Sequence, residues 1–145
     1  MERILFLCTG NSARSQMAEG LARALGGDGV QVWSAGIDPK GIHPLAVRVM
    51  AERGIDISGQ SSKDLSAVPR DPAVVITLCD NAADRCPAFP GRVERVHWSL
   101  ADPAAAAGTE EERLAAFRRT RSEIESRLTA LLRQRGDLAR EPRLG

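Results

Sequence analysis

The sequence predicts an α/β fold, a three-layer sandwich in which a four-stranded parallel sheet is flanked by helices. Four short apolar runs, at residues 3–8, 30–34, 73–78 and 93–98, have the length and composition of buried strands. Segments with helical periodicity separate several of these runs. Strands that alternate with helices form parallel sheets with right-handed crossovers, so both faces of the sheet are covered.

Each predicted helix has a recognisable start or stop. A first helix at residues 12–25 is followed by two glycines, and a second at 44–53 stops at Gly54. A long last helix begins at a capping-box pattern that starts with Thr109. The predicted buried faces are Met17, Leu21, Ala24 and Leu25 in the first helix, and Leu114, Phe117, Ile124, Leu128 and Leu131 in the last.

The bulk properties narrow the class of protein. The 145 residues fit one domain at 1–135 and a polar, mobile tail at 136–145. A net charge of +1 gives no overall field to recruit nucleic acid or a membrane surface. No apolar run suits a signal peptide or approaches the roughly 18 residues of a membrane span. We expect a soluble cytoplasmic protein whose three cysteines serve catalysis, metal binding or redox chemistry.

The stretch CTGNSARS joins the first strand to the first helix, where parallel sheets bind ligands. Its small residues let the backbone curl with the N–H groups inward, and the helix start adds positive charge. Arg14 can then bind a tetrahedral oxyanion through two hydrogen bonds, and the same field favours a Cys8 thiolate. The less favoured alternative is a core cysteine beside a solvent-facing arginine. The predicted oxyanion loop is Thr9, Gly10, Asn11, Ser12, Ala13, Arg14 and Ser15.

Two further cysteines follow the third strand. On a helix, Cys79 and Cys86 would share one face about 10.5 Å apart. A disulfide needs Cα atoms within about 7 Å, so the pair can bond only if the helix unwinds. The alternatives are two buried apolar side chains or, less favoured, a metal site, because His43 and His97 lie at no recognised ligand spacing.

Asp102 and Pro103 follow the fourth strand in an alanine-rich loop. A carboxyl group above an anion pocket can protonate a leaving oxygen. The alternative is an ordinary turn, since Asp-Pro commonly starts one.

The segments CTGNSARSQMAEG, SAGI, VITLCDNAADRCP and HWSLADP resemble the thioredoxin-coupled arsenate reductases, which share the fold of the low-molecular-weight protein tyrosine phosphatases. The likeness extends from about residue 3 to 132. The phosphatases share the Cys-Arg loop and the Asp-Pro pair but not the cysteine pair. The resemblance therefore implies a low-molecular-weight phosphatase-like fold and the reduction of arsenate to arsenite in arsenic detoxification.

The resemblance also implies a relay of three thiols. Cys8 attacks arsenate held by the loop and Arg14, while Asp102 donates a proton. Cys79 attacks the Cys8 sulfur and arsenite leaves. Cys86 then attacks Cys79, and thioredoxin reduces the Cys79–Cys86 disulfide. Phosphate and sulfate are expected as competing oxyanions, and the protein is expected to be a monomer.

By the same resemblance, Ser15 hydrogen-bonds the nucleophile and Asn11 holds the loop's shape. Some members bind a potassium ion behind this loop. Aligning GQSSKDL without a gap puts Lys63 at the last position of that site, where its ammonium would replace the ion and pair with Glu19; no bound metal or cofactor is then expected. A one-residue shift would put Asp64 there instead, and a solvated lysine is the third alternative. The matching positions are Asn11, Glu19, Ser34 and Lys63.

Two other functions remain open. A phosphotyrosine phosphatase would use the same oxyanion loop, but the phosphatases place aromatic residues after the Asp-Pro, whereas alanines occupy 104–107 here and the chain has no tyrosine. A small inorganic oxyanion suits this mouth better, with weak activity on aryl phosphates as a side reaction. A non-enzymatic, redox-switched oxyanion sensor would explain the pocket and the cysteine pair but not an acid at Asp102.

Overall fold

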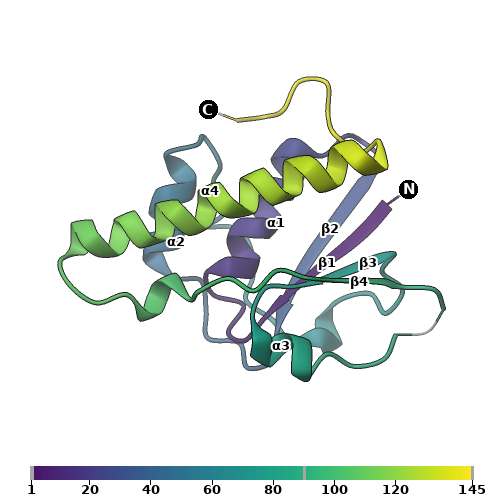
Figure 1. Ribbon diagram of the computed structural model, residues 1–145, viewed down its shortest axis with the longest axis horizontal. Helices are drawn as coiled ribbons and strands as arrows, with labels where there is room; N and C mark the ends of the chain where they lie inside the picture. Colours follow the sequence, from purple (N-terminus) through teal and green to yellow (C-terminus); the bar gives the residue numbers. More distant parts are fainter. Residues whose placement is uncertain (1, 90, 145) are drawn as a thin grey trace.

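The computed structural model describes residues 2–89 and 91–144 (Figure 1). The four strands form one parallel sheet, as the sequence predicts, and the structure gives their order as β2-β1-β3-β4. Because the strands are parallel, their carboxyl ends meet at one edge, and the segments that follow them are brought together there. The strands are β1 (Glu2–Cys8), β2 (Val30–Gly36), β3 (Val74–Thr77) and β4 (Glu94–His97).

Helices cover the sheet. In Figure 1, α1, α2 and α4 lie above the strands and the short α3 lies below them. Among the described residues, no helix has a stretch both long enough and apolar enough to cross a bilayer. The helices are α1 (Arg14–Leu25), α2 (Pro44–Ala51), α3 (Asp80–Asp84) and α4 (Glu110–Arg135), with 3-10 turns η1 (Leu65–Ala67) and η2 (Pro103–Ala105).

The first helix is the most enclosed, because it packs against β1 and β2 on one side and against α4 on the other. Eleven of its 12 residues are buried. The predicted apolar face is buried, and so are the polar residues Ser15, Gln16 and Glu19. Buried polar groups are stable only when they are hydrogen-bonded. The partners of these three lie at the carboxyl edge of the sheet.

Several predicted boundaries shift by one or two residues. The second helix ends at Ala51 instead of 53, and a tighter turn leads to Gly54, which has a positive φ of 71°. The third helix ends at Asp84, and Cys86 lies beyond it, because the residue before a proline disfavours the helical conformation. The predicted two-turn helix that carries both cysteines is therefore wrong: Cys79 caps a shorter helix. Along α4, Leu132 is fully buried in place of Leu131.

The segment after α4 returns to the end of α1. Gly136 adopts a positive φ of 73° and ends the helix. Beyond it, the amides of Ala139 and Arg143 donate to the carbonyls of Leu25 and Ala24 at 2.8 and 2.9 Å. These backbone contacts attach the segment expected as a tail to the main body, and the domain boundary at 135 stays a prediction.

Candidate active site

Residues 9–13 form a loop between β1 and α1. The carbonyl groups of this stretch face outward and accept hydrogen bonds from the amides of the segment after β2. Those bonds leave the loop amides available on the concave side, and within the described chain none of the amides of 9–13 donates to another residue. The free N–H groups at the start of α1 face the same space. Gly36 lets the loop lie close, since a Cβ there would be 2.7 Å from the Asn11 nitrogen. The outer bonds are Ile37 to Cys8, Asp38 to Thr9, Lys40 to Gly10 and His43 to Ser12, at 2.8 to 3.2 Å.

Asn11 organises this loop. Its φ is 44°, a left-handed conformation that asparagine tolerates better than most residues. Its Nδ2 donates to the hydroxyls of Ser15 and Ser34 at 2.8 and 2.9 Å. Its Oδ1 accepts from Gln16 Nε2 at 3.0 Å and from the Lys63 amide at 2.9 Å. The Nδ2 and the Oδ1 of Asn11 each make two hydrogen bonds, and these bonds hold its backbone in the left-handed conformation.

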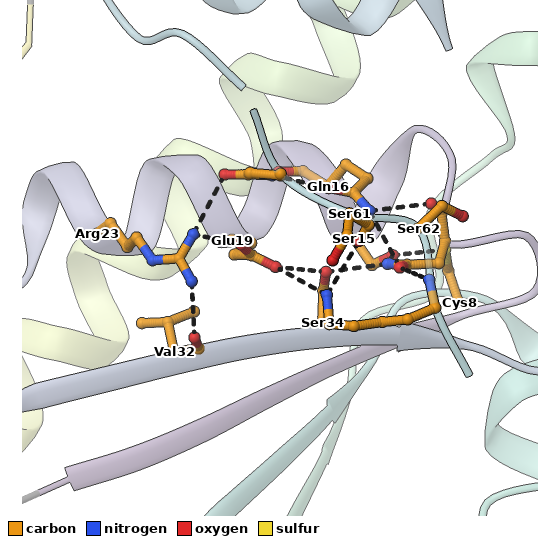
Figure 2. A network of polar contacts seen from close by, with 12 residues as sticks. Cys8, Ser15, Gln16, Glu19, Arg23, Val32, Ser34, Ser61 and Ser62 are labelled. Carbon is orange, nitrogen blue, oxygen red and sulfur yellow. Dashed lines mark hydrogen bonds and ion pairs between the residues drawn. The ribbon is translucent and has the colours of Figure 1, made fainter. Parts of the chain in front are cut away.

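Cys8 is the last residue of β1, and its side chain is almost completely buried, with 2% of the residue exposed. Its Sγ lies 2.8 Å from the Ser15 Oγ. Because Ser15 already accepts from Asn11, its own proton is free to point at the sulfur. Figure 2 shows Ser15 between Cys8 and the rest of the network. The arrangement favours a Cys8 sulfur that accepts a hydrogen bond from the Ser15 hydroxyl.

Behind the loop lies a buried carboxylate. Ser34 Oγ donates to Glu19 Oε1 at 2.6 Å, and Glu19 is only 3% exposed. Two cations face it: Lys63 Nζ at 3.8 Å and Arg23, one helical turn further along α1. Burial lowers the pKa of Lys63, and the Glu19 charge partly opposes that effect. The Lys63 ammonium also donates to Ser61 O at 3.0 Å, so it occupies a defined position and is not a solvated side chain.

Asp64, the alternative to Lys63 in the sequence, faces elsewhere. Its Oδ1 accepts from the amide and hydroxyl of Ser66, and the side chain caps the η1 turn. Those hydrogen bonds lower the pKa of the Asp64 carboxyl. Arg23 was not predicted as a site residue, although its spacing of four from Glu19 on a predicted helix indicates an ion pair.

Arg14 reaches across the mouth of the loop. Its Nη1 donates to the Leu100 carbonyl at 3.0 Å, and its Nη2 lies 3.9 Å from Asp102 Oδ2. The other Asp102 oxygen accepts from the Ala104 amide and caps the η2 turn. The side chain of Asp102 is 45% exposed. One of its oxygens forms the turn, and the other lies beside Arg14 at the cavity.

A cavity of about 390 Å³ opens above the loop. Its lining of amides, hydroxyls and an arginine suits an oxyanion. A larger cavity of about 800 Å³ lies between α1 and β2, and no predicted site residue lines it. The 390 Å³ cavity is lined by Cys8, Thr9, Gly10, Ser12, Ala13, Arg14, Lys40, His43, Asp102 and Ala104.

Lys40 and His43 line this cavity without having been predicted as site residues. Both follow the end of β2, so the strand-end rule that identified the other loops could have identified them. Burial lowers the pKa of His43, aided by the charge of Arg113 and opposed by that of Asp102. His43 Nδ1 also accepts from the Leu45 amide at 3.1 Å, which requires an unprotonated nitrogen.

Cys79 lies beside the oxyanion loop. Its Sγ is 3.3 Å from Thr9 Oγ1, and it accepts from the Ala82 amide at 3.3 Å at the start of α3. Asn81 Nδ2 donates to the same threonine oxygen at 3.1 Å, which leaves the threonine proton for the sulfur. The Cys79 sulfur is therefore next to two donors, the Thr9 hydroxyl and the Ala82 amide in the first turn of α3.

Cys86 lies apart from the loop, beyond the other end of α3. It is half-buried, and its Sγ accepts from Arg95 Nη1 at 3.0 Å. All three thiols are free. The structure thus brings Cys79 to the loop of Cys8 and leaves Cys86 outside it. Within residues 2–89 and 91–144, no group of three or more metal-binding side chains is found.

Comparisons with known proteins agree on the type of fold and site. Residues 3–143 match the family described as low molecular weight phosphotyrosine protein phosphatase. The arsenate reductase of Bacillus subtilis strain 168 is 54% identical over 126 residues, which cover 86% of this chain and 91% of that protein. A solved arsenate reductase in the phosphate binding state has a TM-score of 0.80 at 36% identity and covers 92% of this chain and 98% of its own.

A second solved structure is the thioredoxin-dependent arsenate reductase of Corynebacterium glutamicum. It has a TM-score of 0.71 at 29% identity, and the match covers 92% of this chain and 61% of that one.

Proposed function

This chain belongs to the low molecular weight phosphotyrosine protein phosphatase family and, within it, to the arsenate reductases, and we propose that it reduces arsenate through Cys8, Cys79 and Cys86 in sequence. The observation that carries the proposal is the 3.3 Å contact between Thr9 Oγ1 and Cys79 Sγ. A phosphatase needs only Cys8, Arg14 and Asp102. A second thiol beside the nucleophile's loop serves a reaction that ends in a disulfide.

In the first step the Cys8 thiolate attacks the arsenic atom of hydrogen arsenate. A sulfur–arsenic bond forms, and one arsenate oxygen leaves as water after Asp102 donates a proton to it. The loop amides and Arg14 bind the remaining oxygens, and the Ser15 hydroxyl supports the thiolate. Arsenic is still in its +5 state at this point.

In the second step the Cys79 thiolate attacks the Cys8 sulfur. The sulfur–sulfur bond forms as the sulfur–arsenic bond breaks, and the electron pair of that bond reduces arsenic to arsenite. The hydrogen bonds from Thr9 and the Ala82 amide support Cys79 as the attacking group. A Cys8–Cys79 disulfide remains.

In the third step the Cys86 thiolate attacks Cys79, and Cys8 leaves as a thiolate ready for the next arsenate. Cys86 lies at the far end of α3, so the helix must open for the two sulfurs to meet. The Cys79–Cys86 disulfide is then reduced by thiol–disulfide exchange with thioredoxin. The similarity to a thioredoxin-dependent arsenate reductase supports this reductant.

We further propose that Lys63 replaces a potassium ion behind the loop. A carboxylate, an amide and a hydroxyl from Glu19, Asn11 and Ser34 could surround a cation, but the ammonium of Lys63 already faces Glu19. A second cation, Arg23, pairs with the same carboxylate. These side chains fit an internal cation better than an added ion.

The reaction needs free thiols and a small reductant protein, so we place the enzyme in the cytoplasm and expect it to act as a monomer. Phosphate and sulfate have the shape and charge to compete with arsenate for the loop amides and Arg14. Weak hydrolysis of small aryl phosphates is expected as a side reaction, since Cys8, Arg14 and Asp102 can perform it.

A coupled assay tests the proposal. Purified protein, thioredoxin, thioredoxin reductase and NADPH should consume NADPH when arsenate is added and only while thioredoxin is present. Hydrolysis of an aryl phosphate without arsenate-dependent NADPH consumption would instead assign the chain to the phosphatases. An arsenate-induced conformational response without turnover would support a sensor.

A further inference from the structure

We propose that Arg95 is a positioning residue for Cys86: its guanidinium binds the sulfur in the thiolate form until α3 opens and the sulfur is released to attack Cys79. The proposal rests on the three-thiol relay and adds to it the group that prepares the last nucleophile. Its evidence comes from the contacts of Arg95, from its charge environment and from the way α3 is held at its two ends.

The guanidinium of Arg95 is fixed by three contacts. From β4, its Nη1 donates to Cys86 Sγ at 3.0 Å and its Nη2 donates to the Pro87 carbonyl at 2.8 Å. Its Cζ lies 5.8 Å from the centre of the Phe89 ring, within the range of a cation–π interaction. Two parallel donors on neighbouring atoms orient the guanidinium toward the sulfur, so the contact is directional.

The sulfur is also the group that the charge of Arg95 faces. Among the described residues, Arg95 makes no ion pair with a carboxylate, and its neighbour Glu94 is bound to Arg135 instead. The guanidinium can therefore stabilise a Cys86 thiolate, since a nearby arginine favours that form of a cysteine. Hydrogen bonds from a charged donor are about twice as strong as neutral ones.

The three thiols differ in the donors that they receive. Cys8 and Cys79 are buried and contact hydroxyl groups, those of Ser15 and Thr9. Cys86 is half-buried, and its Sγ accepts from the Arg95 guanidinium at 3.0 Å and lies 3.7 Å from the Pro87 carbonyl, to which the protonated thiol would donate. A charged donor is the kind that can hold a thiolate at such a place.

The two ends of α3 are held differently. At its start, Asp80 Oδ1 accepts from Ser99 Oγ at 3.0 Å and lies 2.9 Å from His97 Nε2. After its end, Arg95 holds Cys86 and Pro87 above a cavity of about 150 Å³ between α3 and β4. Cys86 must leave Arg95 to reach Cys79, so opening at this end breaks the Arg95 contacts and keeps those of Asp80.

The charge contact has a redox consequence. When the Cys86 thiolate attacks Cys79, a sulfur–sulfur bond forms and Cys8 leaves with the negative charge. The Cys86 sulfur is then neutral, and Arg95 has lost its anion. Arg95 therefore stabilises the reduced pair relative to the Cys79–Cys86 disulfide, which makes the disulfide easier for a dithiol to reduce.

The first test measures Cys86 alone. In a Cys8→Ser/Cys79→Ser background, Cys86 is the sole thiol, and its alkylation by iodoacetamide at pH 7 is followed by mass spectrometry. We expect Arg95→Met to slow alkylation about threefold, because a lower thiolate fraction is partly offset by higher nucleophilicity. Arg95→Lys keeps the charge and should restore most of the rate. Arg92→Met removes the same charge from a neighbouring exposed position and should leave the rate unchanged.

Faster alkylation in Arg95→Met would overturn the proposal, since a residue that merely clamps α3 would expose the sulfur when it is removed. An unchanged rate would overturn it as well. The alkylation rate is measured without arsenate. A negative result here would therefore contradict the role of Arg95 and leave the three-thiol relay untouched, and a negative coupled assay would contradict the relay without affecting the alkylation result.

The second test measures the redox equilibrium. The Cys8→Ser variant is equilibrated with defined mixtures of reduced and oxidised dithiothreitol, and the fractions of dithiol and Cys79–Cys86 disulfide are counted after an acid quench. Arg95→Met should raise the disulfide-to-dithiol ratio about tenfold, the size expected for a partly exposed charged hydrogen bond. A ratio equal to that of Arg92→Met would contradict the proposal.

Discussion

Thr9 and Cys79 lie 70 positions apart in the chain, and their side-chain oxygen and sulfur are 3.3 Å apart. The contact follows from the sheet, because β1 and β3 are parallel neighbours and each residue comes just after the end of its strand. Thr9 thus belongs to the oxyanion loop through its backbone and to the second thiol through its side chain. In the proposed relay, this residue connects oxyanion binding with the attack of Cys79.

Thr9→Val should slow the attack of Cys79 while arsenate binding stays intact. Valine keeps the shape of threonine but cannot donate to the sulfur or accept from Asn81. We expect a roughly three- to tenfold lower kcat, the effect of one lost hydrogen bond of about 1 kcal/mol. Steady-state kinetics measure it, and Thr9→Ser, which keeps the hydroxyl, is the matched control. A Thr9→Val variant with the kcat of the parent protein would contradict a role of the hydroxyl, and a loss in Thr9→Ser alone would assign the effect to the methyl group.

Asp102→Asn should lower turnover about 100-fold, because the amide cannot supply the proton to the leaving oxygen. It can still accept from the Ala104 amide, so the η2 turn should be kept. Rates in the thioredoxin-coupled assay and arsenate affinity by calorimetry separate the two effects. Unchanged turnover would show that Asp102 is not the proton donor.

The fold class was predictable because strand and helix periods differ along the chain. Four short apolar runs and the capping box at Thr109 specify the sheet and the last helix. Boundaries were less predictable, since they depend on local competition. Pro87 ends α3 before Cys86, and packing of α4 against α1 and α2 selects Leu132 over Leu131 on a face where either position fits.

Lys63→Asp should make the stability of the protein depend on potassium. The substituted carboxylate would face Glu19 without its ammonium, and a cation could then bind among Glu19, Asn11 and Ser34. We expect the unfolding free energy to be roughly 1–2 kcal/mol higher in potassium chloride than in choline chloride. The parent protein should show no such difference.

Arg70→Asp is the control for Lys63→Asp, because it makes the same charge change at an exposed position. Chemical denaturation in both salts measures all three proteins. A potassium effect on the parent protein would contradict the replacement of the ion by Lys63.

Glu52 should contribute stability that is lost in acid. Hydrogen bonds from Arg118 and then Arg121 lower the pKa of its carboxyl from 4.5 to about 2, and they connect the end of α2 to α4. A depressed pKa stabilises the fold above pH 4.5, and this contribution disappears as the pH falls toward 2. Because the side chain is 38% exposed, we expect only about 1 kcal/mol at pH 7.

Urea unfolding of Glu52→Gln and the parent protein between pH 7 and pH 2 measures the Glu52 contribution. The difference in unfolding free energy should shrink below pH 4.5 and approach zero near pH 2. A difference that is constant over this range would mean that Glu52 acts through packing and not through its charge.

The site was partly predictable for a similar reason. Cys8, Cys79 and Asp102 could be predicted as site residues because each lies at or after the end of a strand. In a parallel sheet, the loops that follow the strands lie at the same edge. The groups that act on these residues from other elements were missed. Arg95 reaches Cys86 from a neighbouring strand, and Lys40 and His43 enter the cavity from the loop after β2. Spacing along the chain does not reveal contacts between distant elements. It does indicate the ion pair of Glu19 and Arg23, which are four residues apart on one helix.

The order of the relay is the central claim, and Cys86→Ser tests it most directly. Without the last thiol, the enzyme should form about one arsenite per protein and stop. Mass spectrometry of the unreduced, alkylated and digested protein should then find a Cys8–Cys79 disulfide. Sustained thioredoxin-dependent turnover in this variant, or a stalled protein with all its thiols free, would contradict the account.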